Sequence, residues 1–121
     1  MVTVDDQPVF LASARDVIDA TPGFTAVGEA DCGEAALEVV DRLDPGLVLL
    51  DVRMPGMGGI ETARLIKSSH PATVVVLISI DEAADLPAES TTSNADALAR
   101  KQDLGPSLLR RLWKAHGSGS A

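Results

Sequence analysis

The chain has 121 residues, of which 45% are hydrophobic, and this length and composition fit one domain with a genuine core and leave no room for a second. Its formal charge of −8 at pH 7 and its three aromatic residues exclude direct nucleic-acid binding, because phosphate backbones repel an acidic surface and bases need aromatic rings for stacking. The longest apolar runs, LVLL at 47–50 and VVVLI at 74–78, are far shorter than the roughly 20 residues that cross a bilayer, so no membrane span is expected.

Short apolar runs that favour strands alternate along the chain with segments of helical length. The five predicted strands lie at residues 2–4, 24–29, 46–50, 73–78 and 95–99. The first helix is predicted after Asp6, with Pro8 near its first position, where a missing N–H is harmless. This alternation predicts an α/β fold in three layers, with helices on both faces of an open parallel sheet.

The later helices are predicted from the residues at their ends. Asp31, with Glu34 three residues later, predicts a capping box at the start of the second helix, and the third helix follows residues 58–59 and ends at 70–71. A fourth helix from residue 81 is expected to be short or irregular, because Pro87 interrupts it. The fifth runs from about 103 to 116, and its leucine stripe fits either a core face or a dimer interface. Residues 1–116 are therefore predicted to form the domain, and 117–121 a flexible tail or truncated linker.

Polar side chains end four of the five predicted strands: Asp5 and Asp6 the first, Asp51 the third, Ser79 the fourth and Lys101 the fifth. In an open parallel sheet, ligands bind outside the carboxyl ends of the strands. Carboxylates gathered there need a counter-charge, because two unit charges ~4 Å apart repel by about 4 kcal/mol at an effective dielectric near 20. Oxygen ligands without clustered cysteine or histidine favour Mg²⁺ or Mn²⁺ over Zn²⁺. Beside such a metal, a carboxylate can act as a nucleophile toward phosphorus.

The acidic pair, the segment LVLLDVRMPGMGG at 47–59, Ser79 after VVVLI, and Lys101 together resemble the receiver domain of two-component response regulators. The resemblance covers nearly the whole chain and implies a flavodoxin-like, doubly wound (βα)5 fold with strand order 2-1-3-4-5. The stretch VGEADCGEAALEVV at 27–40 looks most like receivers that precede a LuxR/FixJ-type DNA-binding domain. Such a resemblance implies transcription regulation through an output domain that this chain does not contain.

The resemblance also implies a phosphorylation-controlled switch, in which Asp51 accepts a phosphoryl group from the phosphohistidine of a sensor histidine kinase. By the same resemblance Asp6 ligates Mg²⁺ directly together with Asp51, Asp5 assists largely through water, and the backbone carbonyl of Arg53 supplies another oxygen. The expected output is association with a second copy or with a partner protein. No enzyme activity is implied beyond the domain's own phosphorylation and dephosphorylation.

Two of the remaining positions match the family pattern, and two depart from it. Ser79 would hydrogen-bond the phosphoryl group, and Lys101 would pair with it. The aromatic residue that usually lies three residues before the lysine is replaced by Leu98, so the usual aromatic switch is absent. The residue after the fourth-strand hydroxyl, usually small, is Ile80, whose branched side chain is expected to narrow access to Asp51.

Two alternative functions are considered, and the sequence disfavours the first of them. Phosphatases of the haloacid dehalogenase type also use a nucleophilic aspartate, but they need an acid two residues later, where this chain has Arg53. A pseudo-receiver, folded and protein-binding without phosphorylation, is consistent with Ile80 and Leu98.

The cysteine and the amino-terminal segment bear on location. Cys32 has no partner for an internal disulfide, and MVTVDDQPVF lacks the basic and apolar regions of a secretion signal, so a reducing cytoplasm is expected. Cys32 itself is interpreted as incidental. His70 and His116 are interpreted as surface residues without partners.

Overall fold

Five parallel strands form one sheet in the computed structural model of the chain, which describes residues 1–80 and 95–117. The strands are β1 (Val2–Val4), β2 (Gly28–Ala30), β3 (Leu47–Asp51), β4 (Val74–Ser79) and β5 (Ala97–Arg100). Their order across the sheet is β2-β1-β3-β4-β5, and every pairing is parallel. The predicted α/β class and strand order are therefore confirmed.

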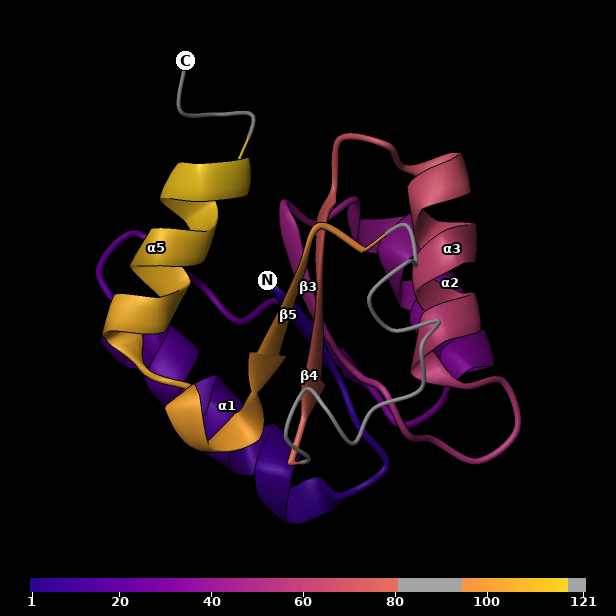
Figure 1. Cartoon of the computed structure of the whole chain (residues 1–121), viewed down its shortest axis with the longest axis horizontal. Helices are drawn as coiled ribbons and strands as arrows, with labels where there is room; N and C mark the ends of the chain where they lie inside the picture. The colour runs from indigo at the N-terminus through magenta and orange to yellow at the C-terminus, as the bar shows by residue number, and fades with distance from the viewer. Residues whose placement is uncertain (81–94, 118–121) are drawn as a thin grey trace.

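Helices cover both faces of the sheet. The helices are α1 (Pro8–Ala20), α2 (Gly33–Leu43), α3 (Gly59–Ser69) and α5 (Pro106–His116), with a 3-10 turn, η2 (Lys101–Asp103), before the last. Figure 1 shows α1 and α5 together on one side of the strands and α2 with α3 on the other. The predicted fourth helix, from residue 81, lies outside the described residues. Within the described ranges, no helix is long and apolar enough to cross a membrane.

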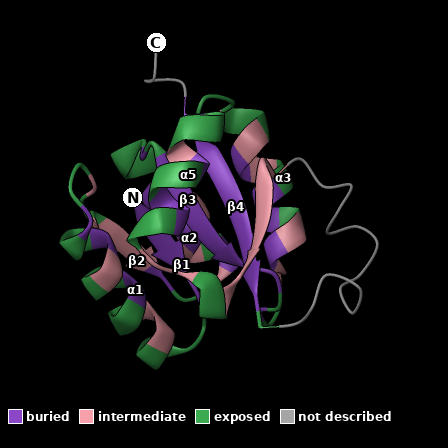
Figure 2. Cartoon of the chain, turned by 60° about the vertical axis from the view of Figure 1, so that its left-hand side comes forward, coloured by how far each residue is buried: buried purple, intermediate pink, exposed green. Residues whose placement is uncertain are grey.

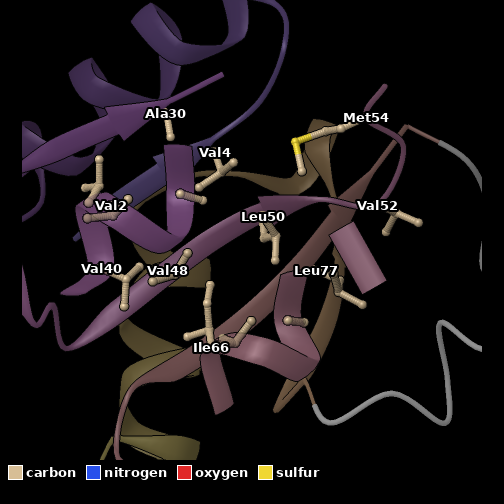
Figure 3. Packing of buried hydrophobic residues seen from close by; sticks show 14 residues of the cluster. Val2, Val4, Ala30, Val40, Val48, Leu50, Val52, Met54, Ile66 and Leu77 are labelled. Carbon is tan, nitrogen blue, oxygen red and sulfur yellow. The ribbon is translucent and has the colours of Figure 1, made fainter. Parts of the chain in front are cut away.

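The core is divided by the sheet into two hydrophobic clusters. The central strands β3 and β4 are buried along their whole length, while the helices expose their outer faces (Figure 2). Because side chains alternate along a strand, Val48 and Leu50 pack toward α2 and α3, whereas Leu47 and Leu49 pack toward α1 and α5. Figure 3 shows the first of these clusters, which also holds Met54 from the loop after β3. Runs that are apolar at every position suit strands buried on both faces, which is why β3 and β4 are predicted well.

The leucines of the last helix point into the core. Leu108, Leu109 and Leu112 are buried in the cluster beneath α1 and α5. The leucine stripe is therefore a core face and is not free to form a dimer interface. The helix begins at Pro106, later than the predicted residue 103, because residues 101–103 form the separate 3-10 turn. Gly117 is its C-cap, and its N–H donates to the Trp113 carbonyl at 2.7 Å.

The start of α2 differs from the prediction. Its N-cap is Cys32, whose Sγ accepts a hydrogen bond from the Ala35 N–H at 3.5 Å. The predicted capping box is wrong, because Glu34 occupies the second helical position, whereas a capping box requires the third. Cys32, interpreted as incidental, instead contributes to the start of this helix.

The second strand is shorter than the predicted 24–29. The Val27 N–H bonds to the Met1 carbonyl at 2.9 Å, and the regular ladder with β1 begins only at Gly28. The Thr25 carbonyl accepts a hydrogen bond from the N-terminal ammonium of Met1 at 2.7 Å instead of one from a regular ladder. Phe24 packs instead against the cluster beneath α1 and α5.

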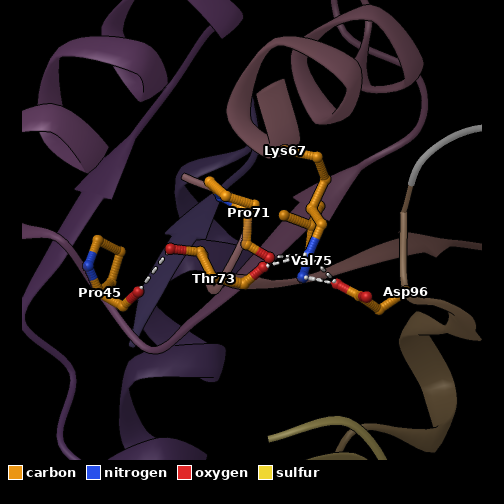
Figure 4. Close-up of polar contacts among 6 residues, drawn as sticks. All are labelled: Pro45, Lys67, Pro71, Thr73, Val75 and Asp96. Carbon is orange, nitrogen blue, oxygen red and sulfur yellow. Dashed lines mark hydrogen bonds and ion pairs between the residues drawn. The ribbon is translucent and has the colours of Figure 1, made fainter. Parts of the chain in front are cut away.

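The starts of β4 and β5 are joined to the end of α3 by one lysine. The Lys67 ammonium donates to the Pro71 carbonyl at 3.0 Å, to the Thr73 carbonyl at 2.8 Å and to Asp96 Oδ2 at 3.0 Å (Figure 4). Asp96 Oδ2 also accepts the Val75 N–H at 2.8 Å, and the Asp96 N–H donates to the Val75 carbonyl at 2.8 Å. These bonds hold the amino ends of the two strands together, at the edge opposite the polar strand ends.

His70 has partners, contrary to the prediction. Its Nε2 lies 2.7 Å from Asp41 Oδ1 and its Nδ1 lies 3.3 Å from Asp44 Oδ1, and the side chain is only 19% exposed. The hydrogen bond with Asp41 is the main reason that the pKa of His70 is raised above its usual 6.5. This contact joins the C-terminal ends of α2 and α3.

Candidate functional site

Three carboxylates meet at the carboxyl edge of the sheet. Asp5 and Asp6 follow β1, and Asp51 is the last residue of β3, the strand that pairs with β1. One carboxylate oxygen from each residue lies within 4.8 Å of the others. Asp5 and Asp51 are buried and Asp6 is exposed. The structure therefore confirms the prediction that these three side chains lie together at one edge of the sheet.

Lys101 brings one positive charge to the carboxylates. It begins η2 directly after β5, and its ammonium lies 2.5 Å from Asp5 Oδ2 and 3.5 Å from Asp51 Oδ2. The lysine side chain is only 12% exposed, so the ammonium exchanges most of its water for these oxygens. β4 separates β5 from β3 in the sheet, and the long lysine side chain spans that distance across the end of β4.

Backbone N–H groups orient the two buried carboxylates. The Gln7 N–H donates to Asp5 Oδ1 at 2.8 Å, and the Arg53 N–H donates to Asp51 Oδ1 at 3.2 Å. In both residues the other oxygen, Oδ2, is therefore the one turned to Lys101. Asp5 Oδ2 is fully buried and has no hydrogen-bond partner among the described residues, so the ion pair with Lys101 is its compensation.

The site carries more negative charge than one lysine offsets. Burial raises the pKa of the Asp51 carboxyl, the negative charge of Asp5 raises it further, and Lys101 and the Arg53 N–H only partly oppose these effects. A buried, under-compensated group of oxygen ligands is the kind of site that a hard divalent cation stabilises. The donor set contains neither a thiol nor an imidazole, which agrees with the predicted preference for Mg²⁺ or Mn²⁺.

The loop after Asp51 is fixed by close backbone packing. Gly59, the first residue of α3, lies so near β3 that an added Cβ would be 1.9 Å from the Asp51 carbonyl oxygen. The Gly59 N–H donates to the Val52 carbonyl at 3.1 Å. Gly56 has a φ of +72°, a left-handed backbone conformation that glycine adopts without strain. The end of β3 and the start of α3 are thus held together through backbone atoms.

The remaining predicted residues lie around this cluster. Ser79 ends β4 and is buried, one position beyond Ile78, which pairs with Asp51. Leu98 is in β5 and packs against the cluster beneath α2 and α3. The predicted metal ligand Arg53 follows β3 by two residues and uses its N–H to hold Asp51.

A groove lies along α1 beside the cluster, with a volume of about 520 Å³. Ile80 lines it and is 70% exposed, and Val9 of α1, on the same groove, is 81% exposed. Phe10 and Lys101 also contribute to its lining. The position of Phe10 beside Lys101 was not predicted, because nothing in the sequence pattern connects these two residues.

Comparison with known proteins decides the family. The sequence profile of the response regulator receiver domain matches residues 1–112. The chain belongs to this receiver family. Receiver domains are signalling domains of two-component response regulators, and the dehalogenase-type phosphatase considered from the sequence is a different family.

The relatives of this chain include LuxR-type regulators. The chain is 31% identical over 115 residues to the nitrate/nitrite response regulator protein NarL of Escherichia coli. The aligned residues cover 95% of this chain and 53% of NarL. The signal receiver domain of the putative response regulator NarL from Mycobacterium tuberculosis is 32% identical, with a TM-score of 0.83 and coverage of 95% and 93%. A LuxR-family two-component response regulator from Aurantimonas has 25% identity, a TM-score of 0.81 and coverage of 94% and 81%. The receiver domain thus spans about half the length of the curated NarL relative.

Proposed function

We propose that this receiver domain accepts a phosphoryl group on Asp51 from the phosphohistidine of a sensor histidine kinase. Phosphorylation would then switch its association with a second copy or with an output partner, and through a LuxR-type DNA-binding domain it would regulate transcription. The observation that carries the proposal is the arrangement of Asp51, buried at a strand end, with two further carboxylates within 4.8 Å and the Lys101 ammonium at 3.5 Å.

The residues of the cluster support a nucleophilic role for Asp51. The Arg53 N–H holds Oδ1, which fixes the carboxylate plane. An Asp51 oxygen attacks phosphorus, a P–O bond forms, and the P–N bond to the donor imidazole breaks, the imidazole leaving with the electron pair. Lys101, already 3.5 Å from Asp51, exchanges its contact with Asp5 for the incoming phosphoryl oxygens. The Ser79 hydroxyl, at the end of the neighbouring strand, donates a hydrogen bond to one of them.

The same carboxylates fit a divalent cation. Asp6 and Asp51 are proposed as direct ligands, Asp5 as a ligand largely through water, and Arg53 as a ligand through its backbone carbonyl. The three carboxylates share the single ammonium of Lys101, and the pKa of Asp51 stays raised beside it, which supports a further positive charge at this place. When bound, Mg²⁺ or Mn²⁺ supplies charge neutralisation to the transferred phosphoryl oxygens.

The groove along α1 is proposed as the docking surface of the kinase. It opens beside Lys101, and its rim exposes two apolar side chains, Val9 and Ile80. A partner that covers them excludes water from the acceptor at the moment of transfer.

The alternative function is a phosphorylation-independent pseudo-receiver that acts as a protein-interaction module. It is favoured by Leu98 and Ile80, which stand where the family usually has an aromatic and a small residue.

Intact mass measurement tests the proposal directly. The wild type, incubated with Mg²⁺ and acetyl phosphate, is expected to gain one phosphoryl group, and Asp51→Asn is expected to gain none. Asp16→Asn, which changes an exposed aspartate of α1, is the matched control and is expected to behave as wild type. An adduct on Asp51→Asn would assign the acceptor to another residue.

Absence of an adduct on folded wild type would favour the pseudo-receiver, and Ile80→Ala is then the first variant to test for restored access. Self-association is measured in the same samples by analytical ultracentrifugation. A rise in mass-average molecular weight that accompanies the adduct, and is absent in Asp51→Asn, is the result expected for a phosphorylation-dependent dimer.

A further inference from the structure

The Lys101 ammonium has a third neighbour besides Asp5 and Asp51. It lies 4.6 Å from the centroid of the Phe10 ring. This distance is within the roughly 6 Å over which the negative face of an aromatic ring attracts a cation. Phe10 belongs to α1 and packs at the edge of the cluster beneath α1 and α5.

The ring matters because a lysine ammonium has to be held in place. Its four-carbon stem rotates freely and its charge is strongly hydrated, so an unconstrained Lys101 would turn toward the water of the groove. With the side chain only 12% exposed, two carboxylate oxygens lie on one part of the ammonium and the ring covers another. Phe10 lines the same groove as Lys101, and its ring lies beside the ammonium.

The use of aromatic residues in the chain is consistent with this role. Phe24 and Trp113, the other two aromatics, line a separate cavity beside Met1 and Gly46. The position three residues before Lys101 holds Leu98, which faces the other side of the sheet. Phe10 is therefore the aromatic residue that this chain places against the lysine of the site.

We propose that Phe10 is a positioning residue, whose ring face holds the Lys101 ammonium within reach of the Asp51 carboxylate. The contact itself is a property of the unphosphorylated protein. Its consequence, faster phosphoryl transfer to Asp51, rests on the proposed function. The two are measured separately.

The contact is tested by NMR on the metal-free, unphosphorylated protein. Ring currents are expected to shift the ε-methylene protons of Lys101 upfield in the wild type and in Phe10→Tyr, which keeps the aromatic ring. The shift is expected to disappear in Phe10→Leu and to persist in the control Phe24→Leu. A wild type without the upfield shift, or a Phe10→Leu variant that keeps it, would overturn the proposal.

The consequence is tested with a graded weakening of the ring. Phenylalanine with one, two or three fluorines is incorporated into a Phe24→Leu background, where Phe10 is the single phenylalanine. Fluorines reduce the negative charge of the ring face with little change in shape, so a purely structural role predicts equal rates. The initial rate of phosphorylation by acetyl phosphate is expected to fall stepwise, by up to about tenfold for a contact worth about 1.4 kcal/mol.

Rates that do not follow the fluorine number would refute the positioning role even if the NMR contact is present. If the wild type accepts no phosphoryl group, the proposed function fails, and the NMR measurement still decides whether Phe10 holds Lys101.

Discussion

Replacing Gly59 with alanine sets two effects against each other. Alanine favours a helix over glycine by about 0.5–1 kcal/mol, so propensity alone predicts that Gly59→Ala is stabilising at the first position of α3. Packing predicts the opposite, because the new Cβ would lie 1.9 Å from the Asp51 carbonyl oxygen and 2.9 Å from Val52 Cα. Both neighbours are backbone atoms, so no side-chain rotation relieves the overlap.

The size of the loss follows from the displacement required. The shortest contact has to widen by at least 1.1 Å to reach the 3.0 Å that real Cβ atoms respect. The backbone of β3 or of α3 has to move by that amount, in a region where the Gly59 N–H is bonded to the Val52 carbonyl. Overpacking of this kind costs about 1–3 kcal/mol or more, which exceeds the gain in propensity, and we expect a net loss of about 2 kcal/mol.

Gly58→Ala is the matched control. A Cβ at Gly58 would meet only the Val52 carbonyl, at 3.7 Å, which is an ordinary contact. Gly58 is the N-cap, so this change is expected to cost about 1 kcal/mol or less. Urea unfolding followed by far-UV circular dichroism measures both variants. A Gly59→Ala protein as stable as Gly58→Ala would refute the steric reasoning.

The overlap also falls on the backbone of Asp51. For this reason the folded Gly59→Ala protein is expected to accept the phosphoryl group from acetyl phosphate more slowly than the folded Gly58→Ala protein.

Three further predictions concern the charged groups. Millimolar Mg²⁺ is expected to raise the melting temperature of the wild type by binding the folded state, and to raise the melting temperature of Asp6→Asn by less. An unchanged melting temperature of the wild type would refute the proposed metal site. Asp41→Asn is expected to reduce the free energy of unfolding most below pH 6.5, where His70 is charged in both the folded and the unfolded state. The loss is expected to become smaller as the pH rises through the raised folded-state pKa of His70. Urea titrations that show an equal loss at all pH values would contradict this prediction. Lys67→Met is expected to lower the free energy of unfolding by about 2–3 kcal/mol, because it removes three hydrogen bonds and the positive charge that pairs with Asp96. Asp96→Asn is expected to lower it by less. A loss under about 0.5 kcal/mol for Lys67→Met in urea unfolding would show that the lysine is dispensable.

The parts of the fold that were predictable depend on local patterns and on general topology. The runs that form β3 and β4 are apolar at every position, a pattern typical of strands buried on both faces, and both strands match to within one residue at each end. The meeting of Asp5, Asp6 and Asp51 follows from the rule that parallel strands present their carboxyl ends at one edge. The reach of Lys101 to the same place follows from the family resemblance and is present in the geometry.

The features that were not predicted depend on contacts between distant segments. The partners of His70 lie 26 and 29 residues away, on the end of another helix, and no periodicity in the sequence connects them. The contact between Phe10 and Lys101 depends on how α1 packs against η2. The cap of α2 was wrong by one residue, because Asp31 and Cys32 both have a side chain able to accept the N–H bond and only the backbone geometry distinguishes them.

Asp51 and Ser79 belong to opposite faces of the sheet. Asp51 shares the alternation of Leu47 and Leu49 and so belongs to the side of α1 and α5, where Phe10 also lies. Ser79 follows the alternation of the residues that face α2 and α3, and Leu98 packs on that side. The proposed phosphorylation would therefore act on residues of both faces of the sheet, with Asp51 on one and Ser79 on the other.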